Sequence, residues 1–326
     1  MKELRLLILG LLATLLTSCS LDDDRDECCG VTLHFRYMLN SENRFVKDVK
    51  SMRHFLFDEN EVFLREVFPP NGFSDRLLVS GLGKYNTKYK LITIGNMTEK
   101  TQVSELVPGV TTLNEFSQQI NSPMQNGYRG NGDQLFYNSC AFSWDENSPT
   151  DYICDLSNIH CHLYVWAYWD HTPKYHGEYS LKITNVPASY SLSPDSTRRI
   201  RQQFDDPDLW ESTTENTVQL FPREPAALTQ HVIEVLPYNY ELEGEFITER
   251  YTDEFVPVLR LFCNDEPITN VIDLERAFTY FRWYPDSDPA QEYWIKMEIH
   301  ADGSVDLNRW IKGEVSDWIN GGIIGG

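Results

Sequence analysis

The strongest candidate for a metal site is the run His160-Cys161-His162. In an extended strand alternate side chains point to the same face, so the two imidazoles would share one side and suit a first-row transition metal. A third ligand at a matching spacing is missing from the surrounding sequence. The alternative is two polar positions on the less buried face of a strand. We therefore expect neither a metal nor any other cofactor.

Acidic pairs are the second candidates for chemistry, because two carboxylates can act as general acid and general base. Asp205 and Asp206 lie in a long polar segment, and Asp286 and Asp288 follow a proline in a predicted turn. A chain with 49 acidic residues brings such pairs together by chance. Sequence motifs of serine hydrolases, zinc proteases and phosphate-binding loops are missing. We expect a non-enzymatic protein without catalytic residues, and a glycoside hydrolase is the weakest alternative.

The N-terminus has the pattern of a lipoprotein signal peptide over residues 1–18. Two basic residues precede an apolar run from Leu6 to Leu16, which is too short to span a bilayer that needs ~20 residues. The run ends in Leu16-Thr17-Ser18-Cys19, which resembles a bacterial lipobox. Cleavage before Cys19 would leave this cysteine to carry the acyl chains that hold the protein in a membrane. The alternative is an ordinary signal peptide that happens to be followed by a cysteine.

Residues 19–27 form an acidic tether between the lipid and the folded part. The stretch resembles the surface-export signal of Bacteroidetes lipoproteins, although a simple solvated linker has the same composition. The whole chain carries a net charge of −21. A polyanion repels phosphate backbones, so we expect no nucleic-acid partner.

Six cysteines remain after Cys19, and an oxidising compartment would allow them to form disulfides. Six cysteines allow 15 connectivities, and the sequence does not choose among them. Cys154 and Cys161 are seven residues apart, roughly 23 Å in extended chain, so they would pair only across a bend. The alternative is that both are small buried hydrophobic residues.

Beyond residue 28 the sequence predicts an all-β protein of many short strands. Apolar and polar residues alternate over 31–37 and again over 159–168. Two apolar runs around Asp58–Glu61 predict a hairpin with a four-residue loop. A change of composition at residues 145–150 predicts two domains, residues 28–150 and 151–326. Further expectations are short helices at 113–120 and from Asp273, and loops at 121–133 and 193–216.

The order of these segments resembles the FimB/Mfa-type fimbrial anchor family, the base subunits of Bacteroidetes type V pili. Besides the lipobox and the acidic tether, the resemblance rests on these segments: Val31–Tyr37, Phe55–Asn60 with Phe63, Tyr89–Ile92 before Gly95-Asn96, Leu135–Tyr137, Gly177–Ile183, and Asp302–Val305 before Trp310. The resemblance implies two tandem transthyretin-like β-sandwiches, N-terminal over 28–150 and C-terminal over 151–326. It also implies an outer-membrane, surface-exposed lipoprotein that anchors a pilus and limits its length.

In this family, subunits are joined by β-strand donation, and the expected partners are major or minor fimbrial pilins. The candidate donor segment spans residues 305–319, with Val305, Leu307, Ile311 and Val315 on one face of an extended chain. The alternative is that it stays as the last strand of the second sandwich. The resemblance also implies that stalk subunits lose their N-terminal strand to an arginine-specific protease. We expect this chain to escape that cleavage, because a cut after Arg25 would free the domain from its lipid.

A surface lipoprotein that binds glycans is the alternative function. Trp166, Trp169 and Trp294 could stack on sugar rings if they were exposed, and packing in a core is the competing interpretation.

Overall fold

A computed structural model describes residues 30–310, except for 84–85, 122–123, 126–127, 146–147, 149, 176, 187–188, 194–221, 225–226, 233–239 and 254–255. The predicted signal peptide, Cys19, the acidic tether and Arg25 lie outside the described residues, as do Ile311 and Val315. Most of the predicted loop at 193–216, with Asp205 and Asp206, also falls outside them.

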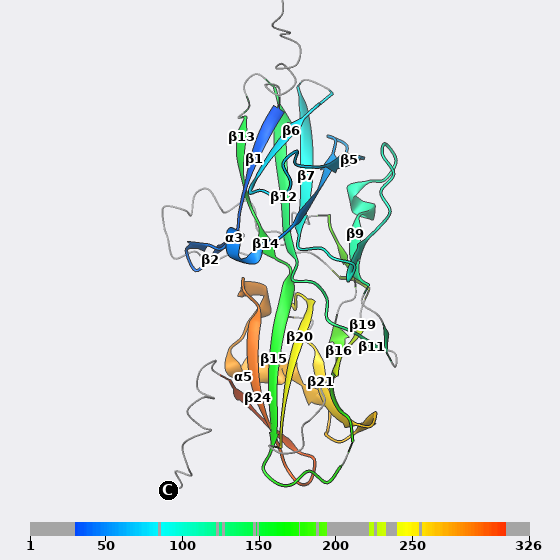
Figure 1. The fold of residues 1–326 in the computed structure, drawn as a ribbon, viewed down its shortest axis with the longest axis vertical. Helices are drawn as coiled ribbons and strands as arrows, with labels where there is room; N and C mark the ends of the chain where they lie inside the picture. Colours follow the sequence, from blue (N-terminus) through cyan, green and yellow to red (C-terminus); the bar gives the residue numbers. More distant parts are fainter. Residues whose placement is uncertain are drawn as a thin grey trace, which may run out of the picture.

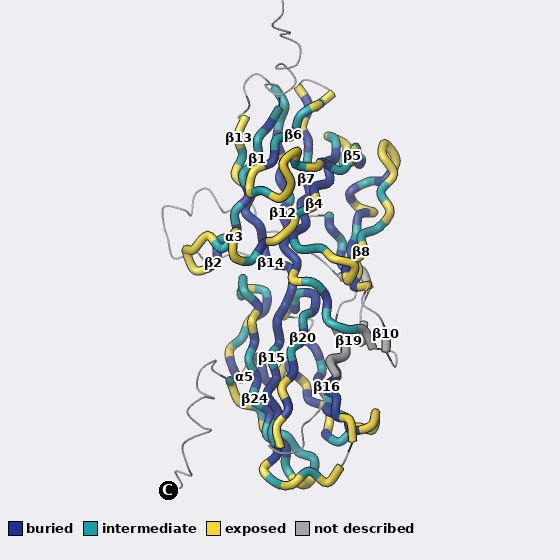
Figure 2. Tube along the Cα trace, in the orientation of Figure 1, coloured by how far each residue is buried: buried dark blue, intermediate teal, exposed yellow. Residues whose placement is uncertain are grey.

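The described chain forms two β-lobes that follow one another along the long axis of the molecule (Figure 1). Buried residues follow the strands inside both lobes, and exposed residues gather in the loops (Figure 2). The prediction of an all-β protein is confirmed. The described helices are short: α3 (Phe45–Asp48), α5 (Leu274–Phe281), and the 3-10 turns η1 (Leu113–Glu115) and η3 (Pro285–Ser287).

The first lobe is built from two main sheets and a third sheet of short strands. The three-stranded sheet has the order β13 (Asp151–Asp155), β1 (Gly30–Arg36) and β6 (Arg76–Ser80). The five-stranded sheet has the order β14 (Ser157–Asn158), β12 (Phe136–Trp144), β7 (Thr87–Gly95), β4 (Met52–Phe57) and β5 (Phe63–Val67). The third has the order β18 (Pro222–Glu224), β17 (Ser189–Ser191), β9 (Ser117–Ile120) and β8 (Thr101–Val103), and β2 (Met38–Leu39) pairs with β3 (Glu42–Asn43).

Strand β1 forms because its apolar residues alternate with polar ones. Val31, Leu33 and Phe35 are buried in the core between the two main sheets, whereas the residues between them face outward. The predicted hairpin is also present as β4 and β5. Asp58 holds its turn because one carboxylate oxygen accepts the backbone N–H groups of Asn60 and Val62, each at 2.9 Å.

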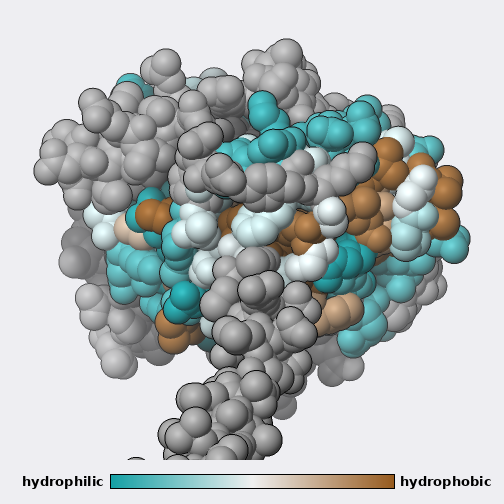
Figure 3. Space-filling view, turned by 90° about the horizontal axis from the view of Figure 1, so that it is seen from above, coloured by the Kyte–Doolittle hydropathy of each residue, from teal (hydrophilic) through white to brown (hydrophobic). Residues whose placement is uncertain are grey.

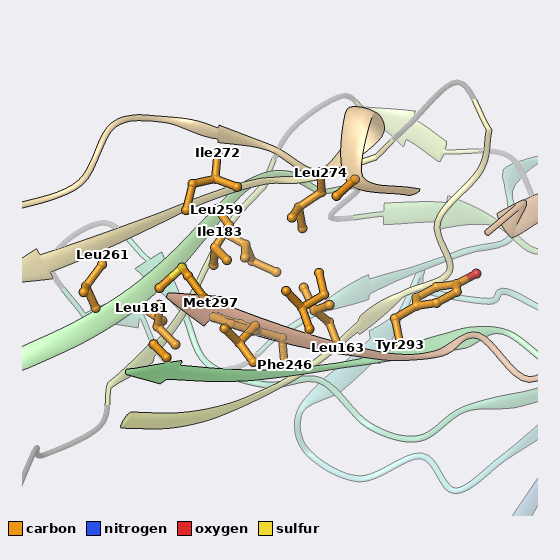
Figure 4. Close-up of a cluster of buried hydrophobic side chains, with 14 of the residues drawn as sticks. Leu163, Leu181, Ile183, Phe246, Leu259, Leu261, Ile272, Leu274, Tyr293 and Met297 are labelled. Carbon is orange, nitrogen blue, oxygen red and sulfur yellow. The ribbon is translucent and has the colours of Figure 1, made fainter. Parts of the chain in front are cut away.

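The second lobe packs two sheets face to face. One has the order β10 (Met124–Gln125), β11 (Tyr128–Arg129), β19 (Ala227–Val232), β16 (Tyr179–Val186), β21 (Val258–Cys263) and β22 (Glu266–Pro267), with β23 (Ile272–Asp273) also on β21. The other has the order β20 (Glu241–Glu249), β15 (His160–Trp169), β24 (Glu292–Ile299) and β25 (Val305–Arg309). Leu181 and Leu261 from the first sheet and Leu163 and Met297 from the second fill the space between them (Figure 4).

Two local expectations change in the structure and a third is confirmed. The helix expected at 113–120 is only the turn η1, because Ser117–Ile120 pairs with neighbouring strands as β9. Residues 121–133 are not all loop, since they contain β10 and β11. The helix expected from Asp273 is confirmed as α5, whose N-cap is the Asp273 carboxylate, which accepts the N–H of Glu275 at 3.0 Å.

The change from one lobe to the next also differs from the boundary expected at residue 150. Strands β13 and β14 pair with β1 and β12, which places residues 151–158 in the first lobe. The four-stranded sheet of the second lobe begins with β15, whereas β10 and β11 already pair with the other sheet of that lobe. The composition change therefore marks the turn between β12 and β13 rather than the passage between lobes.

A partly buried arginine joins the two lobes at this passage. Arg250 follows β20, and its guanidinium donates to the backbone carbonyl of Asn158 at 3.2 Å and to those of Pro285 at 3.3 Å and Pro289 at 3.4 Å. It also donates to the carbonyl of Asp288. One fork of donors thereby ties the end of β14 to the loop that precedes β24.

Two further hydrogen bonds cross the same junction. The side-chain amide of Gln118, on β9, donates to the buried carboxylate of Glu249 at 2.9 Å, and the hydroxyl of Tyr190, on β17, donates to the Arg250 carbonyl at 2.6 Å. Burial raises the pKa of Glu249 to about 8, although the bond from Gln118 opposes this shift. The junction is therefore a polar network rather than a flexible linker.

We expect Arg250→Lys to lower the free energy of unfolding by about 1–3 kcal/mol, because one ammonium group cannot reach all the carbonyls that the guanidinium satisfies. Thermal unfolding of the purified protein measures this loss. Arg276→Lys is the matched control, since the Arg276 side chain is 90% exposed, and it should change stability by less than about 0.5 kcal/mol. Equal unfolding temperatures for the two variants would contradict this role for Arg250.

Candidate functional site

The candidate site for binding another subunit is the free edge of the β20-β15-β24-β25 sheet. Strand β25 is the last strand in this order, and it pairs antiparallel with β24 from Val305 opposite Ile299 to Arg309 opposite Ile295. Among the described residues its other side has no strand partner. An edge strand exposes unpaired N–H and C=O groups to which another chain can add.

Two of the four predicted donor residues can be placed on β25. Val305 and Leu307 are partly buried and pack against the core of the second lobe, whereas Asp306 and Asn308 point to the outer face. The strand is therefore held within its own fold by a ladder and two apolar side chains. Whether it is ever donated stays a prediction.

The first strand, in contrast, is not at an edge. β1 pairs with β13 on one side and with β6 on the other, and its apolar side chains are buried in the core. Arg36, at its end, forms a bidentate ion pair with Asp155 on β13, with Nη2 to Oδ2 at 3.1 Å. Removal of β1 would open a groove between two strands, and its burial and pairing oppose this.

The two strands of interest begin at opposite ends of the molecule. β1 starts at the end of the first lobe that lies far from the second lobe, and the turn before β25 lies at the far end of the second lobe (Figure 1). Seen from the first-lobe end, hydrophilic residues cover much of the described surface and hydrophobic ones gather toward one side (Figure 3).

An aromatic cluster covers the outer face of the sheet beside β25. Tyr164 and Trp294 stack with ring centroids 3.8 Å apart, and Trp310 packs against Trp294 at 5.1 Å and Trp166 at 5.8 Å. Trp166 is only 8% exposed and Trp169 lies in the core against Tyr179. Of the three tryptophans considered for sugar binding, only Trp294 is thus partly exposed.

The two histidines considered for a metal lie on one face of β15, as the alternation predicts, with ring centroids 5.1 Å apart. His160 is buried, its Nδ1 lies 2.8 Å from the carbonyl oxygen of Leu135, and burial lowers its pKa to about 3. His162 lies 3.0 Å from the carboxylate of Glu245. Among the described residues no third ligand joins them in a cluster of suitable size.

A different cluster has the geometry to hold a metal. Ligand atoms of Asp170, Glu298 and His300 lie within 4.8 Å of one another at the far end of the second lobe. The imidazole already contacts Asp170 at 2.8 Å through Nδ1 and Asp306 at 3.1 Å through Nε2. A protonated imidazole donates a hydrogen bond from each ring nitrogen, so His300 can bind both carboxylates. This explains why the three side chains lie together without a metal ion.

Sequence reasoning missed this cluster because its members are distant along the chain. Strand β24 runs parallel to β15 with Trp169 opposite Ile299, so Asp170 and His300 follow at the same end of neighbouring strands. Only the register of this pairing brings them together. The sequence offered one signal: Asp170 and His300 each lie at or just after the end of a predicted strand.

Cys154 and Cys161 are both buried. Cys154 lies in the core of the first lobe and Cys161 in that of the second, so they do not pair with each other. Asp286 and Asp288 lie in and after η3, where Asp288 caps the next turn by accepting the N–H of Ala290 at 3.0 Å. In the part of the chain that the structure describes, no helix has the length and hydrophobicity needed to span a membrane.

A family model gives the relationship of this chain to known proteins. The model of the fimbrillin-A associated anchor proteins Mfa1 and Mfa2 matches residues 25–223, more than half of the sequence. The chain belongs to this family. No curated protein matches the sequence.

Solved structures show the same fold at low sequence identity. The fimbrial anchor protein Mfa2 from Porphyromonas gingivalis is 15% identical with a TM-score of 0.59, over 86% of this chain and 97% of that one. A candidate adhesin from Bacteroides ovatus is 14% identical with a TM-score of 0.60, over 87% and 94%. A candidate polysaccharide-binding protein from Bacteroides thetaiotaomicron is 11% identical with a TM-score of 0.59, over 87% and 99%. The family model confirms the fimbrial anchor resemblance found in the sequence, and these structures show the fold.

The His300 bridge predicts a pH dependence. Hydrogen bonds to Asp170 and Asp306 raise the pKa of His300 to about 9 from its usual 6.5. A raised pKa in the folded state stabilises it fully below about pH 6.5, and this contribution is lost as the pH rises through about 9. NMR titration of the His300 ring should give a midpoint near 9.

The control for this titration is the double variant Asp170→Asn and Asp306→Asn. It removes both negative charges from the imidazole, so the midpoint should fall toward 6.5. A midpoint near 6.5 in the unaltered protein would show that the bridge does not form in solution.

Proposed function

We propose that this protein is an outer-membrane lipoprotein that anchors a fimbria at its base and limits its length. In this proposal it joins a major or minor fimbrial pilin by β-strand donation through its C-terminal edge. Membership in the fimbrial anchor family is the observation that carries the proposal. The protein acts by binding other subunits and the membrane, without a catalytic step or a nucleic-acid partner.

The arrangement of strands supports a position at the end of a fibre. A subunit in the middle of a donated-strand polymer needs an open groove and a donor strand. Here β1 is held between β13 and β6, so among the described strands of the first lobe its place is already filled. A subunit that can donate a strand but has no open groove to accept one can only end a fibre, which gives a physical reason for a limit on length.

The edge strand β25 supports the proposed pairing with a pilin. Its paired length is short, from Val305 to Arg309, and only two of its side chains pack against the core. Few interactions must therefore break for the segment to pair with another sheet, and the alternating side chains of residues 305–319 would set the register. A pilin could equally add a strand to the free side of β25 while it stays in place.

Lipid at Cys19 would fix the opposite end of the molecule. The tether leads into Gly30, which starts β1 at the far end of the first lobe (Figure 1). Surface attachment and the fimbrial edge would then lie at opposite poles. This polarity suits a protein that links a membrane to a fibre.

Glycan binding is the second candidate function. Partly exposed Trp294 and Trp310 on the outer face favour it, together with the structural similarity to a candidate polysaccharide-binding protein. It ranks lower because Trp294 already stacks on Tyr164, which occupies a ring face that a sugar would need.

Co-purification with a fimbrial pilin tests the role of β25. We expect Leu307→Arg to reduce recovery of pilin at least tenfold, because a charge replaces an apolar side chain that sets the strand register. Asn308→Arg adds the same charge on the exposed face and should leave recovery unchanged. Circular dichroism verifies that both variants fold, and normal recovery with folded Leu307→Arg would contradict the use of this edge.

Metabolic labelling with an alkyne fatty acid tests the anchor. We expect Cys19→Ala to lose the label and to leave the membrane fraction, because several acyl chains supply the attachment. Cys28→Ala removes a nearby cysteine and should keep both. Label that persists in Cys19→Ala would place the lipid elsewhere.

A further inference from the structure

Two cysteines of the first lobe lie in one core although they belong to different sheets. Cys140 is on β12 and Cys154 is on β13, and they are 8% and 0% exposed. Both belong to the same cluster of buried side chains, between the three-stranded and the five-stranded sheet. They are thiols in the structure.

The register of the chain places these cysteines opposite each other. β12 pairs antiparallel with β14, with Phe136 opposite Asn158 and Tyr137 opposite Ser157. In an antiparallel register, each residue further along β12 lies opposite a residue one position earlier in the chain, so the partners move from β14 back toward β13. Continued in this way, the register brings Cys140 opposite Cys154.

β13 belongs to the three-stranded sheet, yet it stays close to β12. Contacts on either side of the two cysteines show this. On one side the Asn138 amide donates to the carbonyl of Asp155 at 2.8 Å. On the other, the rings of Phe142 and Tyr152 have centroids 6.0 Å apart. The cysteines lie between these contacts.

The thiols themselves interact. A hydrogen bond between them and burial in the core hold the pKa of Cys154 well above its usual range. The Cys154 thiol is therefore a poor nucleophile once the lobe has folded, and Cys140 lies buried in the same core. Oxidation would have to take place while the core is still open.

We propose that Cys140 and Cys154 form a disulfide in the exported protein. The inference rests on the proposed function, because export supplies the oxidising compartment. The two thiols lose two protons and two electrons, and the S–S bond forms by thiol–disulfide exchange with the disulfide of an oxidoreductase, which leaves as a dithiol. In the test tube, oxidised glutathione takes the same electrons and becomes two molecules of glutathione.

Such a bond would fasten the two main sheets of the first lobe to each other. β12 belongs to the five-stranded sheet, and β13 pairs directly with β1, the strand that continues from the tether. The crosslink closes the loop at residues 141–153 and restricts the unfolded chain. The strand nearest the lipid would then be secured through its neighbour.

Peptide mapping tests the bond on two preparations of the full chain. One is taken from the membrane fraction of an exporting bacterial host, and the other is refolded from the reduced, denatured state with oxidised and reduced glutathione. Free thiols are blocked with N-ethylmaleimide, and a protease that cuts at Asp145 and Glu146 then separates the two cysteines. We expect one mass that contains both peptides and that splits on reduction.

Two variants test whether the joined peptides depend on Cys154. Cys154→Ser should abolish the joined peptides, whereas Cys263→Ser, at a buried cysteine of the other lobe, should retain them. The unaltered chain should also unfold at a lower temperature when a reductant is present.

N-ethylmaleimide on both cysteines in both preparations would overturn the inference, as would a bond from either one to another cysteine. If only the cell-derived protein kept its thiols, the refolded protein would still establish the geometry. That pattern would instead contradict the export on which the proposed function depends.

Discussion

The fork of hydrogen bonds around Arg250 is the interaction on which the arrangement of the two lobes depends. Its guanidinium satisfies carbonyls of Asn158 at the end of the first lobe and of Pro285, Asp288 and Pro289 before β24. Both central strands of the last sheet, β15 and β24, begin beside this group. A loss of the fork would weaken the contact between the end of β14 and the loop before β24, because both share one set of donors, while the bonds made by Gln118 and Tyr190 would remain.

The strands were predictable from the sequence, but the way they pair was not. Alternation over 31–37 and 159–168 gave β1 and β15, because the period of a half-buried strand is a local property. The parallel pairing of β1 with β13 joins residues more than a hundred positions apart, and no local pattern encodes it. The same limit hid the His300 cluster and moved the passage between lobes to the start of β15. Val305 and Leu307 were found because they continue a simple alternation at the chain's last described strand.

The first and the last described strands differ in the number of their strand partners, and the proposed function rests on this difference. The first strand has partners on both sides and an ion pair from Arg36 to Asp155 at its end. The last described strand has one partner and leaves its other side open among the described residues. Sheets with long, open edges invite uncontrolled association, so a short edge of five residues limits pairing to a partner that matches it.

The long strand β15 determines how the molecule would respond to pulling. Its ten residues run from the junction toward the far tip, with β20 antiparallel on one side and β24 parallel on the other. Traction between the two poles would act along these strands and load their backbone ladders in shear. Many hydrogen bonds must then rupture at once, whereas a force across the strands would peel them one by one. The weakest point under such traction would be the five-residue ladder between β24 and β25, so mechanical failure would detach the outermost strand and leave both cores folded.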